Sequence, residues 1–116
     1  FMAFTLTDNA IAGVLSRKQQ AGLLVEGVVE EGQITATGAD YEALRQAGVD
    51  VRLDGNPYTM HHKVIIVDEA VVITGSYNFT RSAAESNDEN VLIIHSPELA
   101  ARYLEEFSRV YQQAQE

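Results

Sequence analysis

Residues 61–75 read His-His-Lys-Val-Ile-Ile-Val-Asp-Glu-Ala-Val-Val-Ile-Thr-Gly, which is two apolar runs separated by a short polar step. Most of their side chains are β-branched, and this favours buried strands. Asp68-Glu69 lies between the runs and has the composition of a hairpin turn. The segment from Lys63 to Thr74 is therefore expected to form an antiparallel pair of strands.

Strands and helices alternate along the rest of the chain. Further strands are expected at residues 2–6, 23–29, 49–53 and 90–95, with an irregular loop at residues 30–38. The expected helices run from a Thr7 or Asp8 cap to Gly22, over residues 39–47, from a Ser82-x-x-Glu85 capping box, and from Pro97 behind Ser96. This order predicts an α/β fold, a layered α-β-α sandwich around a mixed sheet.

Length and composition limit the alternatives. A chain of 116 residues with 46% hydrophobic content can hold one core, so residues 1–116 are expected to form one domain. The absence of cysteine excludes a disulfide framework or a thiolate zinc site, and it leaves the cellular compartment undecided. No apolar run approaches the length of a transmembrane helix.

The hairpin carries the first candidate chemistry. His61 and Lys63 are two residues apart on an extended segment, so their side chains are expected on the same face. An imidazole nitrogen is a nucleophile, and an ammonium beside it suits a phosphate. Ser76 and Asn78 follow the second strand and offer hydroxyl and amide donors to phosphate oxygens. His62, facing away from His61, and His95 fit no such pattern and are assigned no role.

The residues from His61 to Asn78 resemble the HKD signature of the phospholipase D superfamily. That signature is His-x-Lys, four residues, an aspartate, six residues and Gly-Ser-x-Asn, and every position is filled here. The following Phe79-Thr80 and the later Glu89-Asn90 are similar to the bacterial endonuclease-like branch. The resemblance implies the same layered fold, with Asp68 as a structural residue. It also implies that one strand and one helix are missing before Phe1.

The resemblance further implies a mechanism that needs two copies of the motif. One histidine attacks phosphorus to give a phosphohistidine, and a second protonates the leaving oxygen. The second copy is expected from a homodimer or from a further motif upstream of Phe1. Lys63 and Asn78 would hold the phosphate with help from Ser76, while Glu89 would accept the other ring N–H of His61. No metal or cofactor is expected, because lysines supply the positive charge.

The substrate follows less directly from the sequence. The resemblance favours a nuclease, and two alternatives stay open: an enzyme acting on phospholipids, and a non-catalytic binding module. A formal net charge of −9 opposes a broad nucleic-acid surface. Arg52, Lys63 and Arg81 lie near the motif in sequence and could supply local positive charge, or the arginines could be solvated or ion-paired. DNA, RNA and phospholipid are not distinguished by these residues.

Overall fold

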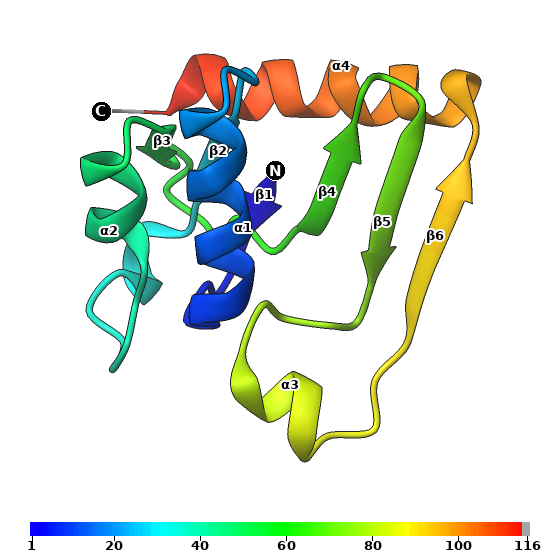
Figure 1. Ribbon diagram of the computed structural model, residues 1–116. Coiled ribbons are helices and arrows are strands. Elements are labelled where there is room, and N and C mark those ends of the chain that lie inside the picture. The colour runs from blue at the N-terminus through cyan, green and yellow to red at the C-terminus, as the bar shows by residue number, and fades with distance from the viewer. Residues whose placement is uncertain (115–116) are drawn as a thin grey trace.

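Six strands form one mixed sheet, which Figure 1 shows edge to edge: β1 (Met2–Ala3), β2 (Glu26–Val29), β3 (Asp50–Leu53), β4 (Lys63–Val67), β5 (Val71–Gly75) and β6 (Val91–His95). The computed structural model describes residues 1–114. The strand order is β3-β2-β1-β4-β5-β6. β1, β2 and β3 are parallel, and β4, β5 and β6 continue the sheet as antiparallel neighbours. The predicted hairpin and mixed sheet are confirmed.

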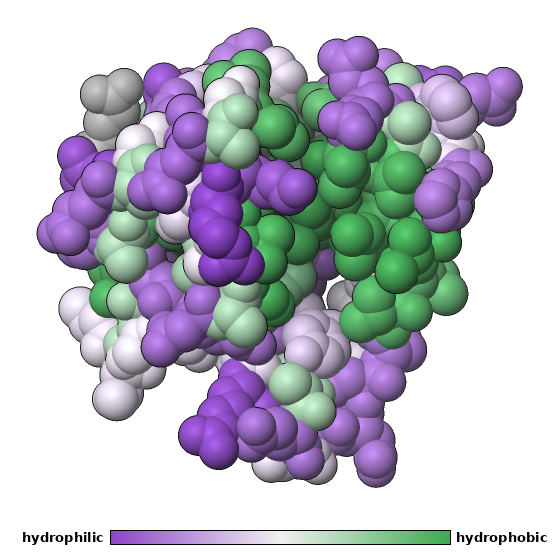
Figure 2. Space-filling view, in the orientation of Figure 1, coloured by the Kyte–Doolittle hydropathy of each residue, from purple (hydrophilic) through white to green (hydrophobic). Residues whose placement is uncertain are grey.

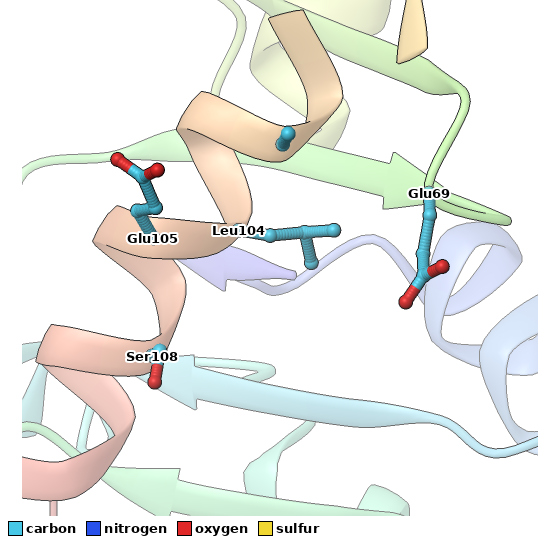
Figure 3. Close-up of a pocket in the computed structure, with 5 residues that line it drawn as sticks. Glu69, Leu104, Glu105 and Ser108 are labelled. Atoms are coloured by element: carbon cyan, nitrogen blue, oxygen red, sulfur yellow. The ribbon is translucent and has the colours of Figure 1, made fainter. Parts of the chain in front are cut away.

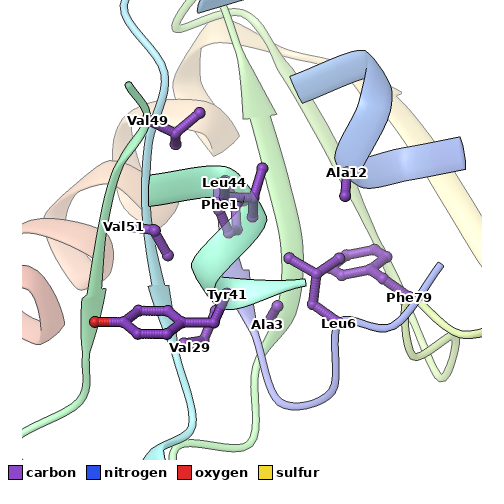
Figure 4. Packing of buried hydrophobic residues seen from close by; sticks show 10 residues of the cluster. All are labelled: Phe1, Ala3, Leu6, Ala12, Val29, Tyr41, Leu44, Val49, Val51 and Phe79. Atoms are coloured by element: carbon purple, nitrogen blue, oxygen red, sulfur yellow. The ribbon is translucent and has the colours of Figure 1, made fainter. Parts of the chain in front are cut away.

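Helices lie on both faces of this sheet: α1 (Asn9–Gln20), the 3₁₀ turn η1 (Glu31–Gln33), α2 (Tyr41–Gln46), α3 (Arg81–Glu85) and α4 (Pro97–Gln113). Ala3 and Val29 pack with Ala12 of α1 and Leu44 of α2 in the cluster drawn in Figure 4. The neighbouring residues Met2 and Val28 point the other way and pack against α4. The predicted α-β-α layering is therefore confirmed.

The two halves of the sheet are covered unequally. In Figure 1, α1 and α2 lie over the half that contains β1, β2 and β3. Figure 2 shows a hydrophobic surface beside them, over the half that contains β4, β5 and β6. The edge strand β6 has large exposed apolar side chains, with Leu92 58% and Ile93 62% exposed.

The connection between β4 and β5 is the tight turn that the local sequence predicts. Asp68 and Glu69 both have positive φ, 53° and 56°, and the N–H of Ala70 donates to the carbonyl of Val67 at 3.0 Å. A turn with two such residues matches the right-handed twist of the strands it joins, which confirms the predicted hairpin turn.

The predicted capping box at Ser82 is wrong. The N-cap of α3 is Thr80, whose hydroxyl accepts a hydrogen bond from the N–H of Ala83 at 3.1 Å. Ser82 lies inside the helix, and Glu85 accepts from Arg81 at 2.7 Å instead of returning to a cap. Thr80, two residues before Ser82, has the extended backbone conformation that an N-cap residue requires.

Several predicted strands are longer than those observed. The first covers only Met2–Ala3, with Leu6 forming a single bridge to Phe79, and the second begins at Glu26. The loop at residues 30–38 contains η1. In the described part of the chain, no helix has both the length and the apolar character needed to cross a membrane.

Candidate active site

His61 lies at the edge of the sheet where the parallel strands end. Because β4 is antiparallel to β1, its first residue, Lys63, pairs with Ala3 at the carboxyl end of β1. The N–H of Phe4 extends this pairing by donating to the carbonyl of His62 at 2.9 Å. The ring of His61 packs edge-on against Phe4, with the ring centroids 4.7 Å apart. The pairing of β1 with β4 thus places His61 beside Phe4, the residue that follows β1.

The side chains of His61 and Lys63 meet on one face, as the sequence predicts. The ammonium nitrogen of Lys63 lies 3.2 Å from Nε2 of His61 and donates to the carbonyl of His61 at 3.1 Å. It also lies 5.4 Å from the centre of the Phe4 ring. Burial lowers the pKa of Lys63, and the charge of Glu89 opposes that change. Because an ammonium only donates, Nε2 accepts in this contact and its lone pair faces Lys63.

A second group of polar residues lies between the end of β5 and the start of β6. The N–H of Ser76 donates to the carbonyl of Asn90, and the N–H of Asn90 donates to Oγ of Ser76, both at 3.1 Å. A Cβ on Gly75 would lie 2.1 Å from that same carbonyl oxygen, so the close approach of these two segments requires glycine.

Glu89 is held in this second group. Its Oε1 accepts from the hydroxyl of Ser76 at 2.5 Å, and its Oε2 accepts from the amide of Asn87 at 3.0 Å. The hydrogen bond from Ser76 is the main cause that lowers the pKa of Glu89, followed by that from Asn87 and then by the charge of Lys63. Glu89 is therefore a carboxylate close enough to Lys63 for each to affect the other.

From the sequence Glu89 is expected to accept a ring N–H of His61, and the structure gives it other hydrogen-bond partners. Both carboxylate oxygens of Glu89 accept from Ser76 and Asn87 instead. The hydroxyl proton of Ser76 is likewise used by Glu89, so it does not point to a phosphate in this geometry. These contacts arise because the loop before β6 brings Asn87 and Glu89 together beside Ser76.

Asn78 reaches the same edge of the sheet through its neighbour Phe79. Phe79 is buried, and its backbone exchanges hydrogen bonds with Thr5, Thr7 and Asp8 after β1. Within the described residues, Oδ1 of Asn78 is buried and has no hydrogen-bond partner. A buried amide oxygen without a hydrogen bond lowers the stability of the fold unless a ligand donates to it. If the amide is turned by 180°, its NH₂ group presents two N–H donors at the same place.

The two arginines named from the sequence are engaged elsewhere. Arg52 forms an ion pair with Asp50 at 3.1 Å and stacks over the ring of Tyr111, 4.0 Å from its centre. Arg81 pairs with Glu85 at 2.7 Å on the exposed surface of α3. The reading of both arginines as ion-paired is thus confirmed, and of the three cations only Lys63 lies beside His61.

From the sequence His62 is assigned no role and is expected to face away from His61, and the structure places it on the α4 side of the sheet. Its Nε2 lies 2.9 Å from Oε1 of Glu106 on α4. The sequence alone predicts this side, because neighbouring residues on an extended segment point to opposite faces of the sheet. Nothing in the sequence identified the partner, which lies 44 residues further along.

A hollow on the surface lies away from this site. Figure 3 shows it between the β4–β5 turn and α4, lined by Glu69, Ala101, Leu104, Glu105 and Ser108. The turn is at the opposite end of β4 from Lys63, so the hollow is separate from the contact between His61 and Lys63. Among residues 1–114, no three His, Cys, Asp or Glu side chains are grouped so that they could hold a metal ion.

The chain matches a protein-family model over most of its length. Residues 1–111 match the model described as "Cardiolipin synthase, PLD-like domain". The mitochondrial cardiolipin hydrolase of Homo sapiens is 38% identical over 110 residues, which are 95% of this chain and 44% of that protein. The phospholipase D of Rickettsia prowazekii is 39% identical over 108 residues, 92% of this chain and 53% of that protein. The chain thus spans about half the length of these curated relatives.

A solved structure has the same fold. It is Nuc of Salmonella typhimurium, described as a phospholipase D family member, with 34% sequence identity and a TM-score of 0.90. The superposition covers 98% of this chain and 77% of that one. The overall fold of this chain is therefore shared with that structure.

Proposed function

We propose, from the premise that this chain belongs to the family of phospholipase D-like domains, that it hydrolyses phosphodiesters through a covalent intermediate on His61. The observation that carries the proposal is the 3.2 Å contact between Nζ of Lys63 and Nε2 of His61. The two side chains share one face at the sheet edge, as a nucleophile and a phosphate-binding cation would need to. A phosphate oxygen would replace Nε2 as the acceptor of the Lys63 proton, which frees the lone pair to attack.

In the first step Nε2 of His61 bonds to phosphorus and the bond from phosphorus to the leaving oxygen breaks. The leaving oxygen takes a proton from a second, protonated imidazole. In the second step that imidazole takes a proton from water, the water oxygen bonds to phosphorus, and the N–P bond breaks. His61 and the second imidazole are thereby returned to their starting states.

One histidine cannot fill both positions in line with phosphorus, so the mechanism needs a second motif. We propose that His61 of another copy of this chain supplies it in a homodimer. Support comes from the chain itself: His62 faces α4, and His95 is on the edge strand β6 at the end that pairs with Val71, far from Lys63.

The polar group at β5 and β6 has a supporting role in this proposal. Asn78 would satisfy its buried amide by binding a phosphate oxygen through an N–H. Ser76 would hold Glu89 in place by the 2.5 Å hydrogen bond. The carboxylate of Glu89 would then favour the protonated form of Lys63, since its charge opposes the lowering of the Lys63 pKa by burial.

Nucleic acid is the first proposed substrate. The Gly75-Ser76-Tyr77-Asn78 element followed by Phe79-Thr80 supports it through the resemblance to endonuclease-like proteins. The charge distribution sets a limit on how such a substrate binds. With Arg52 and Arg81 ion-paired, the cations that a dimer would bring to the scissile phosphate are its two Lys63 side chains, so the slope of log K against log salt should be no steeper than about −2.

Phospholipid is the second candidate, favoured by the names of the relatives, which are a cardiolipin hydrolase and a phospholipase D. The two candidates share the phosphodiester chemistry at His61 and differ in what surrounds the phosphate. Exposed apolar side chains such as Leu92 and Ile93 would suit a lipid surface better than a polyanion.

The experiment compares the purified protein with its His61→Asn variant on three substrates: bis(p-nitrophenyl) phosphate, supercoiled plasmid DNA, and vesicles of phosphatidylcholine with cardiolipin. Turnover of the first, lost in the variant, supports the phosphodiesterase. Plasmid nicking without lipid hydrolysis supports the nuclease, and the reverse supports the lipid enzyme. Folded protein that turns over none of the three would contradict the proposal and leave a binding module.

A further inference from the structure

We infer that His62 is a positioning residue for the reaction, because its hydrogen bond to Glu106 fixes the strand segment that presents His61. This inference rests on the proposed role of His61 as nucleophile. It concerns a residue outside the contact with the phosphate, which acts through its neighbour in the chain.

The first support is the alternation of side chains around the nucleophile. His61, Lys63 and Ile65 share one face, and Ile65 packs into the cluster below α1 and α2. Met60 and Val64 point the other way, and both are buried against α4. His62 stands between them on the α4 side. Its ring is therefore on the layer opposite the reacting group, one residue away from it.

The second support is the strength of the acceptor that His62 finds there. Oε1 of Glu106 lies 2.9 Å from Nε2 of His62 and accepts from a guanidinium nitrogen of Arg109 at 2.7 Å. Oε2 of Glu106 accepts from Nε of Arg109 at 2.8 Å. Arg109 is one turn further along α4, so the carboxylate is held at both oxygens on a 17-residue helix. His62 thus bonds to a group that has little freedom to move.

The third support is that the segment before β4 needs such an attachment. Residues 54–62 form neither helix nor strand, and His61 comes near their end. Two other contacts hold this end: the N–H of Met60 donates to Glu30 at 2.6 Å, and the carbonyl of His62 accepts from Phe4 at 2.9 Å. A shift of one residue in a strand moves each side chain to the other face. Such a shift would turn His61 toward α4.

A pair of variants separates this role from a general loss of stability. His62→Ala removes the contact, whereas His62→Gln keeps an N–H donor at a similar reach. We expect His62→Ala to lower kcat on bis(p-nitrophenyl) phosphate by about 10- to 100-fold with KM changed by less than about threefold, since misplacing a nucleophile costs rate more than binding. His62→Gln should restore most of kcat. Glu106→Ala should match His62→Ala, and the double variant should lose no more than either one.

The control is Glu105→Ala on the same helix. Glu105 is exposed and pairs with Arg102 at 3.7 Å, with no contact to the motif, so kcat should stay at the wild-type value. If His62→Ala does not fold, as judged by circular dichroism, the Glu106→Ala and His62→Gln variants carry the test.

The outcomes distinguish two kinds of failure. Wild-type kcat in folded His62→Ala or Glu106→Ala, together with loss of activity in His61→Asn, overturns the positioning role alone. A fall in kcat for His62→Gln as large as for His62→Ala also overturns it, because the hydrogen bond would then not be the cause. Retained activity in His61→Asn instead removes the proposed function on which the inference rests.

Discussion

The ammonium nitrogen of Lys63 lies 3.2 Å from Nε2 of His61, on the face of the sheet where Ile65 packs under α1 and α2. The strand alternation creates this relationship, because the two residues are two apart at the start of β4. It leaves the reactive nitrogen of His61 occupied by a proton donor until an anion takes that donor. The proposed site would therefore suit a phosphate better than a neutral ester.

His61→Asn should lower phosphodiesterase activity by roughly 10³-fold or more, because it removes the nucleophile and, in a dimer, the acid as well. Initial rates on bis(p-nitrophenyl) phosphate measure this directly. His95→Asn is the matched control, since His95 lies at the far end of β6 and should leave the rate unchanged. A variant at residue 61 with most of its activity would refute the mechanism.

Activity should survive an excess of EDTA. The proposed site uses the imidazole of His61 and the ammonium of Lys63, and neither carries the clustered carboxylates that bind Mg²⁺. The check is the rate before and after chelation, followed by addition of divalent ions. Loss of turnover on chelation and its return with a divalent ion would show that Lys63 and Asn78 do not hold the phosphate as proposed.

The active unit should contain two copies of the motif, most simply as a homodimer. Two Lys63 side chains facing one site repel each other until an anion binds, so phosphate or sulfate should stabilise the dimer. Light scattering at several protein concentrations, with and without phosphate, measures this. An active, monomeric protein that has a single His61-type motif in its whole sequence is incompatible with the mechanism.

Gly75→Ala should destabilise the fold by about 1–3 kcal/mol, since the new Cβ would lie 2.1 Å from the carbonyl oxygen of Asn90 and force β5 and the loop before β6 apart. The same shift should disturb the contact between Ser76 and Glu89 and lower activity. Urea unfolding gives the free energy. Gly13→Ala is the control: it lies inside α1 next to the flexible end of Arg17, and should stabilise by roughly 0.5–1 kcal/mol. Equal stability of the two variants would argue against the close approach.

Glu106 should contribute stability that is lost in acid. Hydrogen bonds from Arg109 and, to a lesser extent, His62 lower the pKa of Glu106 from 4.5 to about 2, against the effect of burial. A carboxylate whose pKa is depressed by folding stabilises above its unfolded value, and this stabilisation fades as pH falls from about 4.5 toward 2. The difference in Tm between wild type and Glu106→Gln should therefore shrink as pH falls from about 4.5 toward 2. A difference that does not change with pH would contradict the ion pair.

Much of the fold could be predicted because its signals are local. The β-branched runs on either side of Asp68-Glu69 form β4 and β5, and Asp8, Ser96 and Pro97 begin helices as expected. Where the prediction was wrong, a nearby residue competed for the same role. Thr80 caps α3 in place of Ser82, because its backbone is extended and its hydroxyl meets the N–H of Ala83.

The sequence by itself determined that His61 and Lys63 share a face, since a strand alternates its side chains whatever surrounds it. Only the tertiary structure decided which partners the remaining polar groups find. Glu89 meets Ser76 and not His61, and His62 meets Glu106 across 44 residues. A hydrogen bond forms within about 3 Å, and the distance between residues so far apart in the chain is fixed only when the helices pack against the sheet.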